Sequence, residues 1–247
     1  AACRPSLRLA VGARLVFVDG TPDIVAYPAT RRGWGRLTRL LTTGNMRAVK
    51  GDCILFLSDL MAHLDDLLVI VMPASTAREQ EAHPNPIPYD LGSELDAGPG
   101  RGMAGRTPAT SVDSPATPPP PPAPRLALVP PAAPRGLAEV LRHLAGAAPG
   151  CVWLAADMPR RGDDLRRLAH LKDIAAAAGV PLLATNDVLY AEAERRPLHD
   201  ILTCIREGTT LHAAGRRLEA NAERHLKPPQ EMARLFRSCP VAIAETV

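Results

Sequence analysis

The residues best placed to perform chemistry follow a predicted buried strand in the second half of the chain. Thr185, Asn186 and Asp187 come directly after the apolar residues of this strand, in the segment 180–185. Ligands of α/β folds bind in the loops that follow the carboxyl ends of parallel strands, so Asp187 could bind a metal ion or a substrate group. Asn186 and Asp187 could also cap the turn by bonding to their own backbone, and the pattern alone favours this structural role.

The histidines supply one further candidate ligand. No two of the seven lie at HxH, HxxH or HxxxH spacing, so no helix or strand presents a local pair of metal-binding imidazoles. His199 is singled out because it follows the Asp187 loop closely, although a lone helical histidine is more often structural than a ligand. The candidate metal-binding residues are therefore Asp187 and His199, and no substrate-binding residue is assigned.

Other catalytic patterns are not found in the sequence. It has no GxxxxGK[ST] loop, no GxGxxG after a predicted strand and no GxSxG elbow. Its acidic neighbours are the adjacent pairs Asp65–Asp66 and Asp163–Asp164, both at predicted helix ends. Capping and the helix dipole explain such pairs better than a two-metal site does, so no catalytic residue is assigned.

The elements that position these candidates are a predicted βαβ unit. Residues 151–156 and 180–185 are strands, and the helix 163–179 between them ends at Gly179. This order implies a parallel pair with a right-handed crossover, and hence an α/β fold. An amphipathic helix at 137–148 precedes the unit. A helix opened by Pro197 and a last helix opened by Pro228 and Pro229 follow, the first expected to point Leu198, Ile201, Leu202 and Ile205 inward.

The first part of the chain shows an equally regular pattern. Strands at 15–18 and 23–27 flank a tight bend at Asp19-Gly20, and residues 67–72 read as a strand buried on both faces. Between them the sequence predicts a helix at 33–45 that ends near Gly44, and another that Ser58 caps. The inward face of the helix 33–45 is expected to carry Trp34, Leu37, Leu40 and Leu41.

The middle of the chain interrupts this pattern. Eleven of the 26 prolines lie between Pro108 and Pro134, and proline has no backbone donor for a helix or a central strand. We expect residues 77–135 to be a disordered or polyproline linker. A docking peptide for an SH3-like partner and a reading-frame error in the source sequence are the alternatives.

Composition places the chain in the cytoplasm. Its 247 residues carry a formal charge of only +3, which gives no sign of a concentrated nucleic-acid-binding face. Five scattered cysteines without a CxxC pair fit a reducing compartment. The longest apolar run, residues 67–72, is too short to span a bilayer, and no signal peptide is expected. Both ends look cut from a longer protein.

Several stretches resemble the PHP domain of the bacterial error-prone DNA polymerases, which are relatives of the replicative polymerase III alpha subunit. The later ones are LLATNDVLY (182–190), ERRPLHDILTCIREGTTL (194–211) and ANAERHLKPPQEMARLF (220–236). The earlier ones are VGARLVFVDGTPDIVAYP (11–28), GRLTRLLTTGNMRAVKGDC (35–53) and LLVIVMP (67–73). The resemblance covers about two thirds of the chain and leaves out the proline-rich middle.

The resemblance implies a partial, distorted β/α barrel of the PHP type. Its parts would be residues 1–76 and 136–215, separated by the linker 77–135, with 216–247 beginning the connection to the polymerase domain. PHP domains with an intact metal cluster have a glutamate in place of Ala13 and a histidine in place of Leu189, and begin with an HxH motif that this chain lacks. Asp187 is retained. The resemblance therefore implies an inactive, structural PHP domain that binds no metal cofactor itself.

For the parent protein, the resemblance implies DNA-directed nucleotidyl transfer in DNA repair and translesion synthesis. Two Mg²⁺ ions would assist it, held by aspartates beyond Val247. Its partners would be DNA, deoxynucleotides, the sliding clamp and damage-tolerance accessory proteins, without a membrane. The alternatives are a free-standing PHP-family metal-dependent phosphoesterase, and a non-catalytic interaction module or gene remnant.

Overall fold

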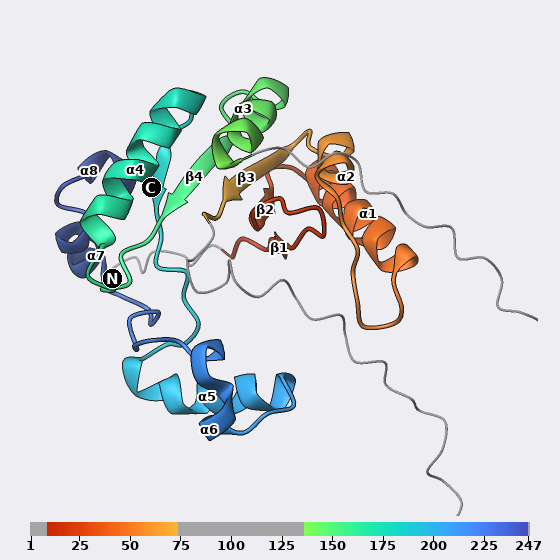
Figure 1. The fold of residues 1–247 in the computed structure, drawn as a ribbon. Helices are drawn as coiled ribbons and strands as arrows, with labels where there is room; N and C mark the ends of the chain where they lie inside the picture. The colour runs from red at the N-terminus through yellow and green to blue at the C-terminus, as the bar shows by residue number, and fades with distance from the viewer. Residues whose placement is uncertain (1–8, 74–135, 247) are drawn as a thin grey trace, which may run out of the picture. The chain divides into compact units, whose positions relative to one another are not determined.

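The computed structural model describes residues 9–73 and 136–246, which form one mixed α/β unit (Figure 1). The whole of the predicted linker 77–135 lies outside the described residues. The predicted domain boundaries therefore stay predictions.

The centre of the unit is a five-stranded sheet in the order β1-β2-β3-β4-β5. The antiparallel part joins β1 (Ala13–Leu15), β2 (Ile24–Pro28) and β3 (Leu67–Val71). The parallel part joins β3 to β4 (Val152–Ala156) and β5 (Leu182–Ala184). The α/β prediction is confirmed. Within the described residues the sheet is not closed, and the PHP-type barrel stays a prediction.

The connection between β1 and β2 is longer than the predicted tight bend. The first strand ends at Leu15, and residues 16–23 form a loop. The reason is Asp19, whose carboxylate accepts hydrogen bonds from the backbone N–H groups of Thr21, at 3.1 Å, and Leu57, at 2.8 Å. The loop is thus fixed by a contact 38 residues away, which a local turn pattern does not reveal.

Two helices pack beside the antiparallel strands, and their details correct three predictions. In α1 (Arg31–Arg47), Leu37 and Leu40 are buried but Trp34 is half exposed. Gly44 does not end this helix: a Cβ there would lie 2.5 Å from Cys53 Sγ, so the glycine permits close packing. The second helix, α2 (Leu57–Ala62), is preceded by Phe56 rather than capped by Ser58.

The predicted βαβ unit is confirmed. The helix α4 (Asp164–Ala178) connects the parallel neighbours β4 and β5, and Gly179 ends it in the left-handed conformation at φ 69°. Before it, α3 (Leu137–Ala147) buries Val140, Leu141 and Leu144 as expected. The final helices α7 (Pro229–Leu235) and α8 (Pro240–Ala244) follow, and α8 packs against β5. Phe236, between them, is fully buried in the core.

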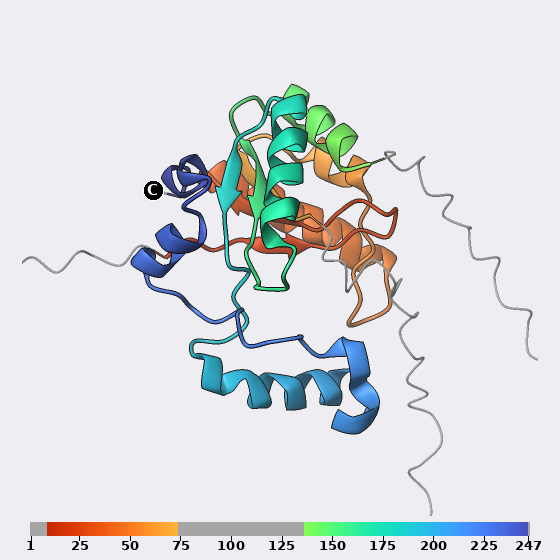
Figure 2. The same cartoon turned by 60° about the vertical axis from the view of Figure 1, so that its left-hand side comes forward.

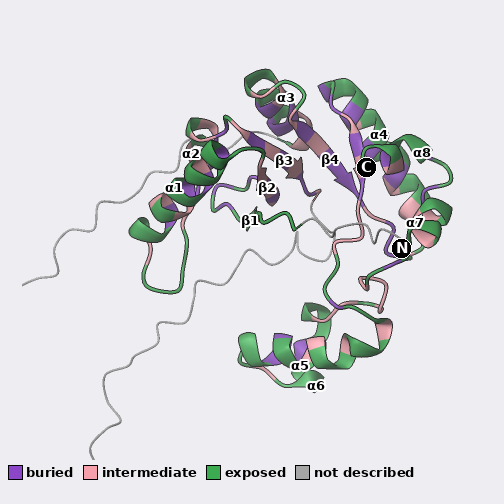
Figure 3. Cartoon of the chain, turned by 180° about the vertical axis from the view of Figure 1, so that it is seen from behind, coloured by how far each residue is buried: buried purple, intermediate pink, exposed green. Residues whose placement is uncertain are grey.

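The helix opened by Pro197 exposes the apolar face that was predicted to be buried. Figure 2 shows α5 (Arg196–Arg206) and α6 (Leu211–Ala214) connected to β5 and α7 by extended segments. Two short 3₁₀ turns, Ala193–Arg195 and Gly215–Arg217, flank them. Most of α5 is coloured as exposed in Figure 3. The apolar side chains that were expected to point inward are among its exposed residues, because the helix is attached through its other face. Those exposed side chains are Leu198, Ile201, Leu202 and Ile205.

Candidate functional site

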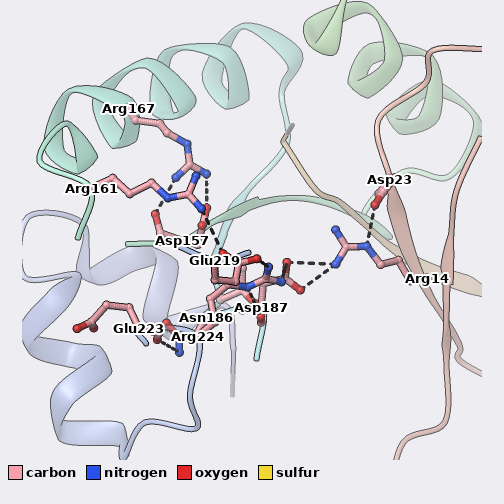
Figure 4. Close-up of polar contacts among 11 residues, drawn as sticks. Arg14, Asp23, Asp157, Arg161, Arg167, Asn186, Asp187, Glu219, Glu223 and Arg224 are labelled. Carbon is pink, nitrogen blue, oxygen red and sulfur yellow. Dashed lines mark hydrogen bonds and ion pairs between the residues drawn. The ribbon is translucent and has the colours of Figure 1, made fainter. Parts of the chain in front are cut away.

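Asp187 lies in the loop that follows β5, where it is held between two arginines (Figure 4). Arg14, from β1, donates through Nη1 to Oδ1 at 2.9 Å and to Oδ2 at 3.1 Å. Arg224 pairs with Oδ2 through Nη2, and its Nε donates to the Asp187 carbonyl at 2.8 Å. Both carboxylate oxygens therefore accept from guanidinium groups that come from distant parts of the sequence.

The two arginines extend this contact into a chain of alternating charges. At one end, Arg14 Nε donates to Asp23 Oδ2 at 2.8 Å. At the other, Arg224 Nη1 donates to Glu219 Oε1 at 2.6 Å, and the second Glu219 oxygen accepts from Arg161 at 3.4 Å. We call the six residues the charge chain: Asp23, Arg14, Asp187, Arg224, Glu219 and Arg161.

Partial burial strengthens these pairs. The side chains of Arg14, Asp187 and Arg224 keep only 33, 26 and 15 % of their surface exposed. Burial alone would lower the pKa of Arg14, but the neighbouring Asp187 and Asp23 carboxylates outweigh it and raise the pKa above its ordinary value. The guanidinium therefore keeps its positive charge beside the Asp187 carboxylate.

Nearby carboxylates at this edge of the sheet are paired in the same way. Asp157, directly after β4, pairs with Arg167 of α4. Glu223 contacts Arg160 at 3.2 Å and Lys227 at 3.1 Å. These acidic groups therefore already have cationic partners from the protein itself.

Hydrogen bonds fasten the segment 219–227 to the Asp187 loop. Asn186 Nδ2 donates to the carbonyl of Glu223 at 3.0 Å and also to that of His225. Tyr190 forms a parallel bridge with His225. Locally, Asp187 N donates to Thr185 Oγ1 at 3.2 Å. The polar side chains after β5 thus mainly join separate parts of the chain.

His199 lies in a different environment from Asp187. On α5 its ring packs against that of Tyr190, with centroids 5.8 Å apart, and its buried Nδ1 has no hydrogen-bond partner among residues 9–73 and 136–246. Among the described residues, His199 and Asp187 share no hydrogen bond or ion pair. No group of three or more His, Cys, Asp or Glu side chains in the described ranges could hold a metal ion.

The donor set does not fit the metal cluster that the PHP resemblance implies. Ala13 and Leu189 offer no lone pair, and the oxygens of Asp187 already accept from Arg14 and Arg224. Sequence reasoning missed both arginines. A signal was present, because Arg14 directly follows Ala13, where the resemblance implies a glutamate ligand, and Arg224 lies within one of the resembling stretches.

The known proteins to which this chain is similar in sequence share one name. The chain is 44% identical over 240 residues to the error-prone DNA polymerase of Rhodopseudomonas palustris (strain BisB5). It is 42% identical over 240 residues to that of Brucella abortus biovar 1 (strain 9-941). Both matches cover 97% of the chain. The chain is homologous to one segment of the error-prone DNA polymerases.

The extent of the match corrects one expectation and confirms the resemblance to the error-prone DNA polymerases, while the PHP assignment stays a prediction. Because 97% of the chain is covered, the aligned range also spans residues 77–135, which we expected to be left out. The chain spans only 16–21% of the length of the error-prone DNA polymerases that it matches. No family model matches the chain. In the described residues, no helix is both long enough and apolar enough to cross a membrane.

Proposed function

We propose that this segment is the PHP-type portion of an error-prone DNA-directed DNA polymerase, and that it has a structural role without metal-dependent chemistry of its own. The homology over 97% of the chain supports the first part. The second part rests on a single observation: Asp187, the ligand that the resemblance retains, is held by Arg14 and Arg224. Two guanidinium groups stand beside the carboxylate that would otherwise bind a cation.

The charge chain gives this structural role a physical basis. It joins β1, the loop after β5 and the segment 219–227, which are up to 210 residues apart in sequence (Arg14 to Arg224). A divalent cation can join carboxylates in the same manner, but it is lost when its ligands are lost. Arginine supplies a permanent charge and a planar fork that matches a carboxylate, so the joint is part of the polypeptide.

For the complete protein we propose templated nucleotidyl transfer in DNA repair and translesion synthesis in the cytoplasm. A primer 3′-hydroxyl would attack a deoxynucleotide α-phosphate with the help of two Mg²⁺ ions. The residues that hold those ions would lie outside this segment, as would the contacts to DNA, nucleotides, the sliding clamp and accessory proteins.

The test is to express the complete reading frame and to measure template-directed primer extension with Asp187 intact and with Asp187→Asn. We expect extension in both, with the rate per folded molecule unchanged and the thermal midpoint lowered in the variant. A folded full-length protein that does not extend the primer would contradict the polymerase assignment. A large loss of rate at full stability would contradict the structural role.

The rival function is a free-standing PHP-family phosphoesterase. It predicts hydrolysis of p-nitrophenyl phosphate by the chain in the presence of Mn²⁺, and loss of that activity in Asp187→Asn. We expect no Mn²⁺-dependent turnover above that of a boiled sample.

A further inference from the structure

The helix α5 presents its apolar face outward and its polar face inward. Leu198, Ile201, Leu202 and Ile205 recur at the spacing i, i+3, i+4 and i+7, which places them on one side of the helix. Their exposed fractions lie between 46 and 71 %. A surface helix in an isolated domain has the reverse orientation, so something outside the described residues is expected to cover this face.

The opposite side of α5 explains how the helix is held in this orientation. Thr203 and Cys204 are buried there. Arg196, at the start of the helix, donates to the carbonyl of Glu219 at 2.6 Å and lies 3.6 Å from Asp200. Polar contacts therefore fix α5 to the segment that carries the charge chain, and they leave the four aliphatic side chains free.

The exposed face adjoins a hollow of about 270 Å³. Leu198 and Leu202 belong to both, and Leu189, Tyr190 and His199 complete most of its wall. The wall is mainly apolar, but it also includes Arg195 and the buried Nδ1 of His199, to which no described residue forms a hydrogen bond. A hollow of this kind fits an aliphatic or aromatic anchor side chain.

We infer that this face of α5 and its hollow form the seat for an apolar surface of the same polymerase polypeptide, from the part outside residues 1–247. This inference rests on the proposed function. The relatives are longer than the matched segment by a factor of about five to six, because that segment is 16–21% of their length. A large amount of further chain is therefore available as the occupant.

The size of the face favours a tethered occupant over a separate molecule. An 11-residue helix is only about 16 Å long. Stable complexes between separate proteins bury roughly 800 Å² on each partner, more than one side of such a helix offers. A surface within the same polypeptide needs less area, because the covalent connection raises its effective concentration.

The direct test places a photoreactive benzoylphenylalanine at Ile205 of the complete polymerase and identifies the cross-linked peptide by mass spectrometry. The matched control carries the same group at Leu165, which is 64 % exposed on α4 and outside the face. We expect position 205, but not 165, to cross-link within one polypeptide to a peptide outside residues 1–247. Cross-links to a second copy, to another protein or to residues 74–135, or none, would overturn the inference.

A second measurement separates this inference from the proposed function. In the complete polymerase, the double substitution Leu202→Gln and Ile205→Gln should lower the thermal midpoint by on the order of 5 °C, whereas Leu165→Gln should leave it unchanged. If primer extension is present but neither the shift nor the cross-link is found, only the docking inference fails. If primer extension is absent, the proposed function fails whatever α5 contacts.

Discussion

The charge chain and the outer face of α5 differ in whether the described residues supply partners for their side chains. Asp187 and Glu219 have arginine partners inside the segment. On α5, the aliphatic side chains of Leu202 and Ile205 remain exposed although water is an unfavourable environment for them. The described residues therefore supply cationic partners for these carboxylates but leave the apolar face of α5 uncovered.

Within the charge chain the largest expected effect comes from Arg224→Met, which removes the arginine between Asp187 and Glu219. Asp187 and Glu219 each lose a close partner, and both remain partly buried. We expect the free energy of unfolding of the chain to fall by about 2–3 kcal/mol, less than for a fully buried pair because water reaches these groups. Urea denaturation measures this change.

A matched control for Arg224→Met is Arg39→Met. Arg39 is an exposed arginine on α1, and its guanidinium group makes no hydrogen bond or ion pair with any described residue. Its substitution should change the free energy of unfolding by less than about 0.5 kcal/mol. Equal losses of stability in the two variants would contradict this account, because the paired arginine of the charge chain would then contribute no more than an unpaired surface arginine.

Arg14→Met should have a smaller effect than Arg224→Met. Arg14 is more exposed, and Asp187 keeps Arg224 as a partner. We expect a loss of about 1 kcal/mol in the same denaturation experiment. The double variant should lose more than the sum of the two single variants, because only then is Asp187 left without any arginine; simple additivity would show that the two pairs do not share one carboxylate.

The ion pair between Arg47 and Asp59 is a second place at which charge pairing can be tested, because its contribution to stability should depend on pH. Burial would raise the pKa of Asp59, but the hydrogen bonds from Arg47 and from the Phe56 N–H outweigh it and lower that pKa. A carboxyl whose folded pKa is lowered stabilises the protein above its unfolded pKa of about 4, and this contribution is lost as the pH falls.

The expected result is that acidification from pH 7 to pH 3 reduces the stability of the wild type more than that of Asp59→Asn. Thermal unfolding at a series of pH values measures it. Parallel pH profiles would show that Asp59 contributes nothing that depends on its charge.

The smallest expected effect comes from Ile205→Ala in the 247-residue chain. This side chain is already 71 % exposed, so its truncation should change the free energy of unfolding by less than about 0.5 kcal/mol. The comparison variant is Leu141→Ala, whose side chain is fully buried in α3, with an expected loss of about 2–5 kcal/mol. A cost for Ile205→Ala near that of Leu141→Ala would show that the chain itself covers the face.

The sequence predicted most elements because their patterns are local. The βαβ unit, the strand after Asp23 and the left-handed Gly179 all follow from periodicity and from residue types at the ends of elements. The incorrect predictions arise where residues that are separated in the sequence contact one another. Asp19 bonds to Leu57, and Gly44 makes room for Cys53, neither of which a local window shows.

The sequence predicted the position of the site but not the residues that pair with Asp187. Asp187 does follow a parallel strand, yet its partners Arg14 and Arg224 are 173 and 37 residues away, so their convergence depends on the fold. The orientation of α5 was wrong for a related reason. Periodicity identifies an apolar face, but it does not reveal whether the chain itself covers that face.

The most direct test of the structural role of Asp187 is a calorimetric titration of Mn²⁺ into the chain at neutral pH, with Asp187→Asn as the control. We predict no stoichiometric binding and identical titrations for the two proteins, because the Asp187 carboxylate already accepts from Arg14 and Arg224. One Mn²⁺ bound per chain at micromolar concentration, and lost in Asp187→Asn, would contradict it.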